Sequence, residues 1–189
     1  MGYIEDYAAQ CARLIAELDA QAIEQIADAL YRCFRAGGCI FAMGNGGSGA
    51  TASHLVNDIN KAVCANTPRP KAIALTDNMP WFSALANDIG YHAVFEEQLK
   101  NFLQPDDAVV GISGSGNSEN VLRAVRYAKQ VGAPTVALVG FDGGKLKGLA
   151  DICLHVPCHD MGMVEGIHSV VCHIIPLAMR RRAEEDGLG

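Results

Sequence analysis

Apolar positions follow two different rhythms along this chain. Over residues 3–36 they recur every three to four residues, which is the spacing of an amphipathic helix, and a polar stretch near Asp19 divides the pattern. We expect one long helix or two consecutive helices here, ended by Gly37 and Gly38. Further along, short apolar runs are bounded by glycine, proline or polar residues. These runs predict five buried strands, over residues 39–43, 71–77, 107–113, 134–140 and 151–157.

Helical patterns separate the predicted strands. They cover residues 48–62, 79–103 (as one or two helices), 119–132 and 163–182, the last with Pro176 as a potential break. Strands that are apolar throughout and alternate with helices are typical of a parallel sheet covered on both faces. We therefore expect a single α/β domain over residues 1–189. It should be a three-layer sandwich around a five-stranded parallel sheet, with residues 1–36 forming additional N-terminal helices.

Composition narrows the class of function. The net charge is −6 and the basic cluster is limited to Arg180–Arg182, which disfavours nucleic acid as a main partner. No apolar run approaches the roughly eighteen residues of a membrane span, and the acidic, helical N-terminus is not typical of a secretion signal. The seven cysteines are scattered without a CxxC pair, which favours a reducing compartment. We expect a cytoplasmic protein that binds neither nucleic acid nor a membrane.

Two glycine-rich loops follow separate predicted strands. The first is GNGGS (44–48), and the second is SGSGNSEN (113–120), in which three serines surround two glycines at a helix start. Glycine lets backbone N–H groups approach an anion, while helix N-termini and hydroxyls add further favourable partners. The alternative is that Asn117 or Ser118 only caps a helix and the glycines only form turns. Two such loops at the ends of strands in one sheet favour a phosphate site. The spacing is neither GxxxxGK[ST] nor GxGxxG, so nucleotide hydrolysis and dinucleotide binding are disfavoured.

Histidines and carboxylates recur on two of the predicted helices. His54 and Asp58 lie four residues apart and hence on one face, while Glu165 and His173 differ by only about 80° in azimuth. Two imidazoles and two carboxylates from two helices would suit zinc or a similar divalent ion. The alternatives are histidines packed in the core and a surface ion pair between His54 and Asp58.

The two loops, together with ALANDIGY (84–91) and VALVGFDGGKLKGLAD (136–151), resemble the SIS (sugar isomerase) domain family. The resemblance implies a flavodoxin-like fold. Within the family the chain is most similar to the phosphoheptose isomerase branch, from about residue 36 to the end, and the N-terminal helices also fit that plan. By this resemblance residues 1–36 form an oligomerisation segment of a homotetramer whose active sites lie between subunits.

The resemblance also implies roles for individual residues. The serines of the second loop would hold the phosphate, the first loop would line the sugar, and an Asn-Asp pair would lie next to the active site. His168 also matches a family histidine, to which we assign a structural role. The implied substrate-binding residues are Asn45, Gly46, Ser48, Asn87, Asp88, Ser113, Ser115 and Ser118; the implied catalytic residues are Asp58, Glu165 and His173; the implied metal ligands are His54, Asp58, Glu165 and His173.

Two of these positions depart from the family pattern. The family usually has Glu where this chain has Asp58 and Gln where it has Glu165, and an acidic residue and an arginine at the positions of Gly162 and Met163. Aspartate is one methylene shorter, and a misplacement near 1 Å can lower a rate about a hundredfold. Glu165 restores a carboxylate from the opposite helix, and the extra negative charge favours a metal ion or raises one carboxylate's pKa.

The resulting hypothesis is an aldose–ketose isomerase with a divalent metal, converting sedoheptulose 7-phosphate to D-glycero-D-manno-heptose 7-phosphate. Asp58 or Glu165 would remove the proton next to the carbonyl and His173 would relay it, through an enediol(ate). The product would feed nucleotide-heptose and surface-polysaccharide synthesis. The alternatives are an isomerase of another sugar phosphate and a non-catalytic sugar-phosphate-binding regulator or assembly protein.

Overall fold

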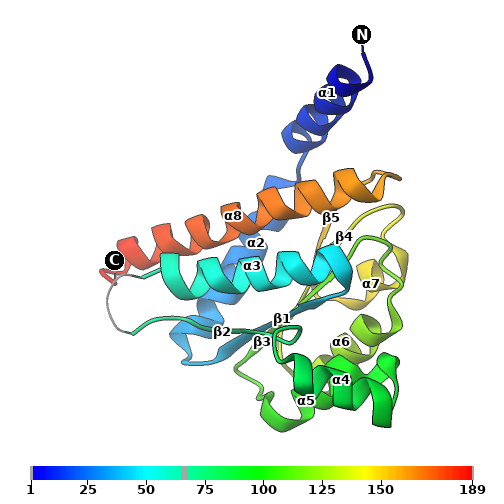
Figure 1. The fold of residues 1–189 in the computed structure, drawn as a ribbon. Coiled ribbons are helices and arrows are strands. Elements are labelled where there is room, and N and C mark those ends of the chain that lie inside the picture. Colours follow the sequence, from blue (N-terminus) through cyan, green and yellow to red (C-terminus); the bar gives the residue numbers. More distant parts are fainter. Residues whose placement is uncertain (1, 65–67, 189) are drawn as a thin grey trace.

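The N-terminal region forms two helices, not one. The computed structural model describes residues 2–64 and 68–188, and it begins with α1 (Tyr3–Ala16) and α2 (Ala20–Arg35) (Figure 1). The polar stretch near Asp19 accounts for the break, because the Asp19 side chain caps α2 by accepting a 3.0 Å hydrogen bond from the Ala22 amide. α1 projects away from the body of the molecule, whereas α2 is buried against it.

Five parallel strands form the central sheet, in the order β2-β1-β3-β4-β5. They are β1 (Cys39–Gly44), β2 (Lys71–Ala74), β3 (Ala108–Ser113), β4 (Thr135–Val139) and β5 (Ile152–His155). The strand order reverses between β1 and β3, so the loops after these two strands flank the switch point of the sheet. The predicted α/β fold with a five-stranded parallel sheet is confirmed, although each strand but β1 is shorter than its apolar run.

Helices cover both faces of the sheet in three layers (Figure 1). One face packs against α2, α3 (Gly46–Ala62) and α8 (Met161–Glu185). The other packs against α5 (Val94–Phe102), α6 (Glu119–Val131) and α7 (Gly144–Leu149). The alternation is visible in β1, where Ile40 and Ala42 face the first layer while Phe41 and Met43 face the second. α4 (Met79–Asp88) and the 3₁₀ turn η1 (Tyr91–Ala93) complete the second side.

Residues 79–102 form α4 and α5 joined by η1, in agreement with the two-helix alternative. The short helix α7 was not predicted, and the course of α8 differs from expectation. α8 runs without a break through Pro176, and it begins and ends beyond the predicted bounds. Pro176 is buried, so packing on the core outweighs the one hydrogen bond that proline removes.

α8 is long and apolar enough to match a membrane span by length and composition. Half of the relevant window is nevertheless buried inside the protein, against α2 and α3. The core helix of a globular protein has the same properties, so the hydropathy of α8 is explained by its packing.

Candidate active site

A cavity of about 260 Å³ lies where β1 and β3 end. Its walls are the loop between β1 and α3, the loop between β3 and α6, and the start of α8. The structure therefore brings together six of the eight predicted substrate-binding residues and one predicted catalytic residue: Asn45, Gly46, Ser48, Ser113, Ser115, Ser118 and Glu165.

The serine loop (residues 113–118) gathers hydroxyl groups at the start of α6. Ser113 ends β3 and Ser118 precedes the first turn of α6, and their hydroxyl oxygens lie 3.1 Å apart. Neither hydroxyl caps the helix, since Ser118 makes no side-chain cap hydrogen bond. The first turn of α3 lines the same cavity through Gly46, Gly47 and Ser48. Two helix N-termini and several hydroxyls thus meet at one place, which is a favourable environment for phosphate.

A neighbouring loop holds the serine loop in place. The Gly140 amide donates to the Gly114 carbonyl at 2.9 Å, and the Leu146 amide donates to the Gly116 carbonyl at 2.9 Å. Gly116 has a φ of +63°, and a Cβ built there would overlap the carbonyl oxygen of Gly143. Position 116 therefore requires glycine, both because of its backbone conformation and because the backbone of Gly143 lies so close.

Glu165 reaches the cavity from α8. Its carboxylate lies directly over Gly47, where a Cβ would overlap the carboxylate atoms. Sequence reasoning did not single out Gly47 or Met161, both of which also line the cavity. The GNGG run contained a signal for Gly47, since glycine at a helix start leaves room for a side chain such as Glu165 to approach the backbone. Nothing in the sequence distinguished Met161.

His54, Asp58 and His173 form a second cluster, on the adjoining faces of α3 and α8. His173 Nδ1 lies 3.1 Å from Asp58 Oδ2, and His54 Nε2 lies 3.5 Å from the same oxygen. The two imidazole rings meet edge to face with centroids 4.6 Å apart. Their side chains are 44% and 58% exposed, compared with 22% for Asp58, so the cluster opens to the surface.

This cluster could hold a metal ion. One ligand atom from each of the three residues lies within 4.8 Å of the others, and two imidazole nitrogens with a carboxylate oxygen are a common donor set for zinc. The structure thus groups three of the four predicted metal ligands. Glu165, the fourth, lies at the cavity beside Gly47 and is not part of the group.

Asn87 and Asp88 lie away from both clusters. They occupy the last turn of α4, where both are exposed and the Asn87 amide donates to the Asp88 carboxylate at 2.8 Å. Neither residue lines the cavity at the strand ends. Their substrate-binding role remains a prediction.

His168 is buried in the core and is not part of either cluster. Its Nε2 donates to the Val139 carbonyl at 3.3 Å, and its Nδ1 has no hydrogen-bond partner among the described residues. Burial disfavours the charged imidazolium and lowers the pKa of His168 to about 4. At neutral pH the ring is therefore a neutral, packed side chain, in line with the structural role expected for it.

The buried His168 predicts a pH dependence of stability. The pKa of His168 is lower in the folded than in the unfolded protein. As the pH falls below about 6.5, the unfolded chain therefore takes up a proton at this residue while the folded protein does not, and the free energy of unfolding decreases. Between pH 7.5 and 5 we expect this residue alone to lower the free energy of unfolding by about 2 kcal/mol. Urea denaturation at both pH values should show a weaker pH dependence in His168→Gln. The exposed His159→Gln should behave as the wild type, and equal pH dependence in all three proteins would contradict the prediction.

Comparisons with known proteins agree with this architecture. The sequence model of the SIS domain matches residues 2–140, a range that contains both glycine-rich loops. The phosphoheptose isomerase of Trichlorobacter lovleyi is 38% identical over 172 residues, covering 91% of this chain and 87% of that protein. A probable phosphoheptose isomerase of Thermoplasma acidophilum is 38% identical over 169 residues, covering 89% of this chain and 93% of that protein.

A solved structure shares the whole fold. The phosphoheptose isomerase of Neisseria gonorrhoeae superposes with a TM-score of 0.86 at 30% identity, covering 93% of this chain and 96% of that one. At 93% coverage the match extends beyond residue 140, where the SIS sequence model ends. The SIS sequence model matches most of this chain, and a solved phosphoheptose isomerase shares its fold. The chain therefore belongs to the SIS domain family.

Proposed function

We propose that this protein is a phosphoheptose isomerase, an aldose–ketose isomerase that converts sedoheptulose 7-phosphate to D-glycero-D-manno-heptose 7-phosphate. Relatives of that name at 38% identity and a solved one at a TM-score of 0.86 support the proposal. The observation that carries it is the anion cavity beside a carboxylate, with a His–Asp–His cluster further along the same two helices. The product would enter nucleotide-heptose and surface-polysaccharide synthesis.

The arrangement suits an open-chain sugar phosphate. Ser113, Ser115 and Ser118 would hold the phosphate, and the sugar would extend along α8 past Glu165 toward His173. Eight residues separate Glu165 from His173, so their backbones lie about 12 Å apart along the helix axis. A sugar phosphate bound by the serines would therefore meet Glu165 before its far end approaches His173.

The reaction requires a base and a proton relay. A carboxylate of Asp58 or Glu165 would remove a proton from C1 of the ketose, leaving a cis-enediol(ate), and the proton would return to C2 while hydrogen moves from O1 to O2. His173 is placed to move a proton between these oxygens, because Asp58 holds its Nδ1 at 3.1 Å and fixes the orientation of the ring. The other ring nitrogen is left to face substrate.

His54, Asp58 and His173 would hold a divalent ion, with zinc favoured by their two nitrogen donors and one oxygen donor. When bound, the ion would polarise the carbonyl and stabilise oxyanion charge. Metal binding competes with proton transfer at both Asp58 and His173, so Glu165 is the natural candidate for the base when these two residues hold the metal.

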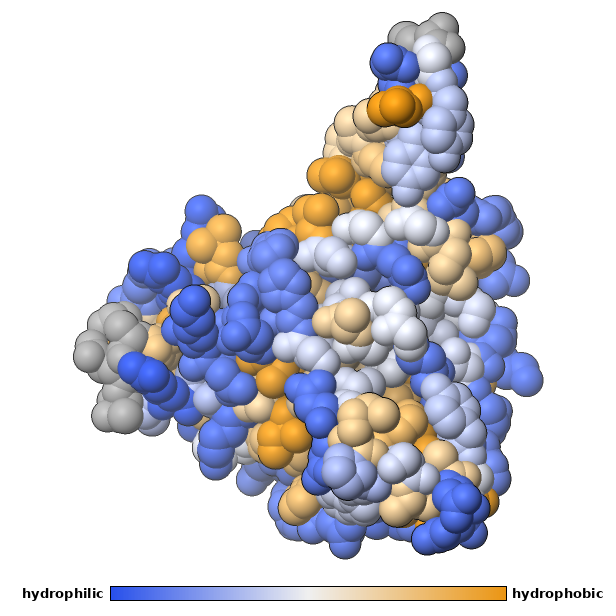
Figure 2. Space-filling model, viewed as in Figure 1, coloured by the Kyte–Doolittle hydropathy of each residue, from blue (hydrophilic) through white to orange (hydrophobic). Residues whose placement is uncertain are grey.

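A homotetramer in the cytoplasm completes the proposal. α1 projects from the body and exposes Tyr3 and Ile4, which are 83% and 75% accessible, and Figure 2 shows apolar atoms along this helix. Such side chains favour burial against other subunits. The exposed Asn87 and Asp88 could then reach a site of a neighbouring subunit. All seven cysteines are free thiols, as is usual in a reducing compartment.

Turnover by metal-stripped protein tests the function directly. We expect negligible isomerisation of sedoheptulose 7-phosphate after chelation and recovery on addition of zinc, because carbonyl polarisation is lost with the metal. Aldose formation is followed by a coupled assay, and bound zinc per chain is measured in parallel. Equal activity with and without metal would contradict the metal proposal, and no activity in either state with folded protein would contradict the heptose assignment.

An isomerase of another sugar phosphate is the second candidate. The Glu165 carboxylate inside the cavity and the short Asp58 favour it, because both differ from what the phosphoheptose branch usually has at these positions. A panel of five- and six-carbon ketose phosphates in the same assay separates the two. Binding of all of them without turnover would instead favour a sugar-phosphate-binding regulator.

A further inference from the structure

The two loops that form the cavity are joined by a pair of asparagine side chains. Asn45, at the end of β1, and Asn120, in the first turn of α6, exchange two hydrogen bonds. Asn45 Nδ2 donates to Asn120 Oδ1 and Asn120 Nδ2 donates to Asn45 Oδ1, each at 2.9 Å. Asn120 is only 2% exposed and does not line the cavity, whereas Asn45 does.

Two further contacts hold the pair. The Tyr91 hydroxyl donates to Asn45 Oδ1 at 2.8 Å, and the Val121 amide donates to Asn120 Oδ1 at 3.0 Å. The Val121 N–H can only donate, so it fixes Asn120, and a flip of Asn45 alone would then place oxygen against oxygen and nitrogen against nitrogen across the pair. The contacts of Asn45 therefore allow one orientation of its side chain.

This orientation limits what Asn45 can offer a ligand. Its oxygen accepts two hydrogen bonds within the protein, which fills both lone pairs. One of its two amide hydrogens is also used, by Asn120. The single remaining N–H can only donate, so Asn45 can recognise an acceptor oxygen, such as a phosphate or carbonyl oxygen, and cannot accept from a sugar hydroxyl.

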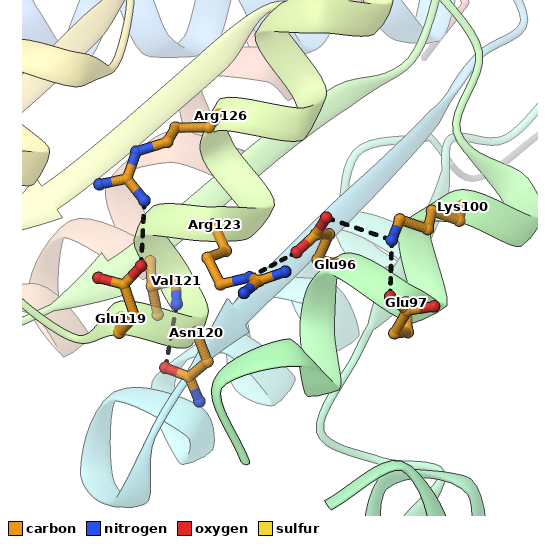
Figure 3. A network of polar contacts seen from close by, with 8 residues as sticks. All are labelled: Glu96, Glu97, Lys100, Glu119, Asn120, Val121, Arg123 and Arg126. Atoms are coloured by element: carbon orange, nitrogen blue, oxygen red, sulfur yellow. Dashed lines mark hydrogen bonds and ion pairs between the residues drawn. The ribbon is translucent and has the colours of Figure 1, made fainter. Parts of the chain in front are cut away.

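The partners of Asn45 are held on a common frame. Figure 3 shows Asn120 in the first turn of α6, near the Arg123–Glu96 ion pair that joins this helix to α5. Arg123 Nε lies 2.6 Å from Glu96 Oε2, and Glu96 lies 3.2 Å from Lys100. Tyr91 is the first residue of η1, which leads directly into α5. The Arg123–Glu96 ion pair therefore joins the helix that carries Asn120 to the segment that carries Tyr91. The Asn45 side chain is thus held by two residues whose elements pack on each other.

We propose that Asn120 is a positioning residue for the isomerase reaction. It keeps the amide of Asn45 turned with its free N–H toward the acceptor oxygens of the sugar phosphate, and it fixes the spacing of the two loops. The inference rests on the proposed function for the identity of the ligand. The asparagine pair itself depends on neither the metal nor the catalytic residues.

Asn120→Leu tests the inference, since leucine is similar in size and adds no charge near the phosphate. We expect KM for sedoheptulose 7-phosphate and the Kd for inorganic phosphate to rise about tenfold, the scale on which loss of the partner of a buried polar group is felt. The value of kcat should change less, because the residues that move protons are untouched. Tyr91→Phe removes one hydroxyl at an exposed residue and should raise both constants about threefold, so it provides the test if Asn120→Leu does not fold.

Asn60→Leu is the matched control. Asn60 also makes two 2.9 Å hydrogen bonds between elements, both to the backbone of Ala72 in β2, but it does not line the cavity. It should lower the melting temperature and leave KM and phosphate affinity unchanged. Unchanged KM and phosphate Kd in folded Asn120→Leu or Tyr91→Phe would overturn the inference.

Phosphate binding by calorimetry separates this inference from the proposed function. If the wild type binds inorganic phosphate but does not isomerise the heptose phosphate, the proposed function fails and the phosphate Kd of the variants still decides the role of Asn120. If the wild type binds no phosphate, the inference fails as well.

Discussion

Asp58→Asn is expected to lower kcat for sedoheptulose 7-phosphate by about a thousandfold, within the range that general acid–base groups contribute. Asp58 is the carboxylate that contacts both histidines of the cluster, at 3.1 and 3.5 Å. Asparagine has nearly the same shape and can still accept from His173, but it carries no charge and cannot take a proton. The loss should therefore appear in kcat while the phosphate affinity stays constant.

Comparison with Glu165→Gln assigns the base. If Asp58 mainly binds the metal, Asp58→Asn should lower bound zinc per chain together with kcat, whereas Glu165→Gln should lower kcat and keep the metal. If Asp58 is the base, Asp58→Asn should lower kcat and keep the metal. Glu165→Gln should then have the smaller effect on kcat, because the glutamine amide could still act as a ligand. Asp28→Asn, on α2 and paired with Arg182, is the control and should behave as the wild type. A kcat within tenfold of the wild type in Asp58→Asn would contradict a catalytic role for this residue.

The sheet could be predicted because its strands are buried on both faces. Each strand is then a continuous apolar run, and glycine or polar residues mark its ends. The ends themselves depend on neighbours that the sequence does not reveal. Residues 71–77 read as one strand, but β2 pairs with β1 only from Lys71 to Ala74, because the later residues of β1 pair with β3 alone.

The candidate site could be predicted in part, since helical periodicity gives direction around a helix but not the reach of side chains along it. Glu165 and His173 share a face of α8, which led to a single group of four ligands. They are about 12 Å apart along the axis, however, and Glu165 turns to Gly47 instead. The Asn45–Asn120 pair joins residues 75 positions apart, and such a contact depends on the order of the strands.

Gly116→Ala is expected to weaken phosphate binding by about tenfold to a hundredfold, because two or three hydrogen bonds to the anion, each worth about 1 kcal/mol, would be lost. An alanine Cβ would overlap the Gly143 carbonyl oxygen, which belongs to the backbone and cannot rotate away. The serine loop would have to separate from the loop at residues 140–146 and would lose the hydrogen bonds at Gly114 and Gly116. Ser113, Ser115 and Ser118 would then no longer converge on one anion.

Gly132→Ala supplies the control, because Gly132 also has a positive φ, of +90°, but no atom lies near its Cβ position. Both alanines carry the cost of a left-handed backbone, about 1–2 kcal/mol, which corresponds to a fall in melting temperature of about 2–8 °C for a chain of this size. Only Gly116→Ala adds the overlap with a second loop, so only this variant should lose phosphate affinity. Calorimetry with inorganic phosphate and thermal melting of both variants measure the two effects separately. Equal phosphate affinity in the two variants would mean that the serine loop does not depend on its neighbour, and the anion site would then have to be stabilised by the helix N-termini alone.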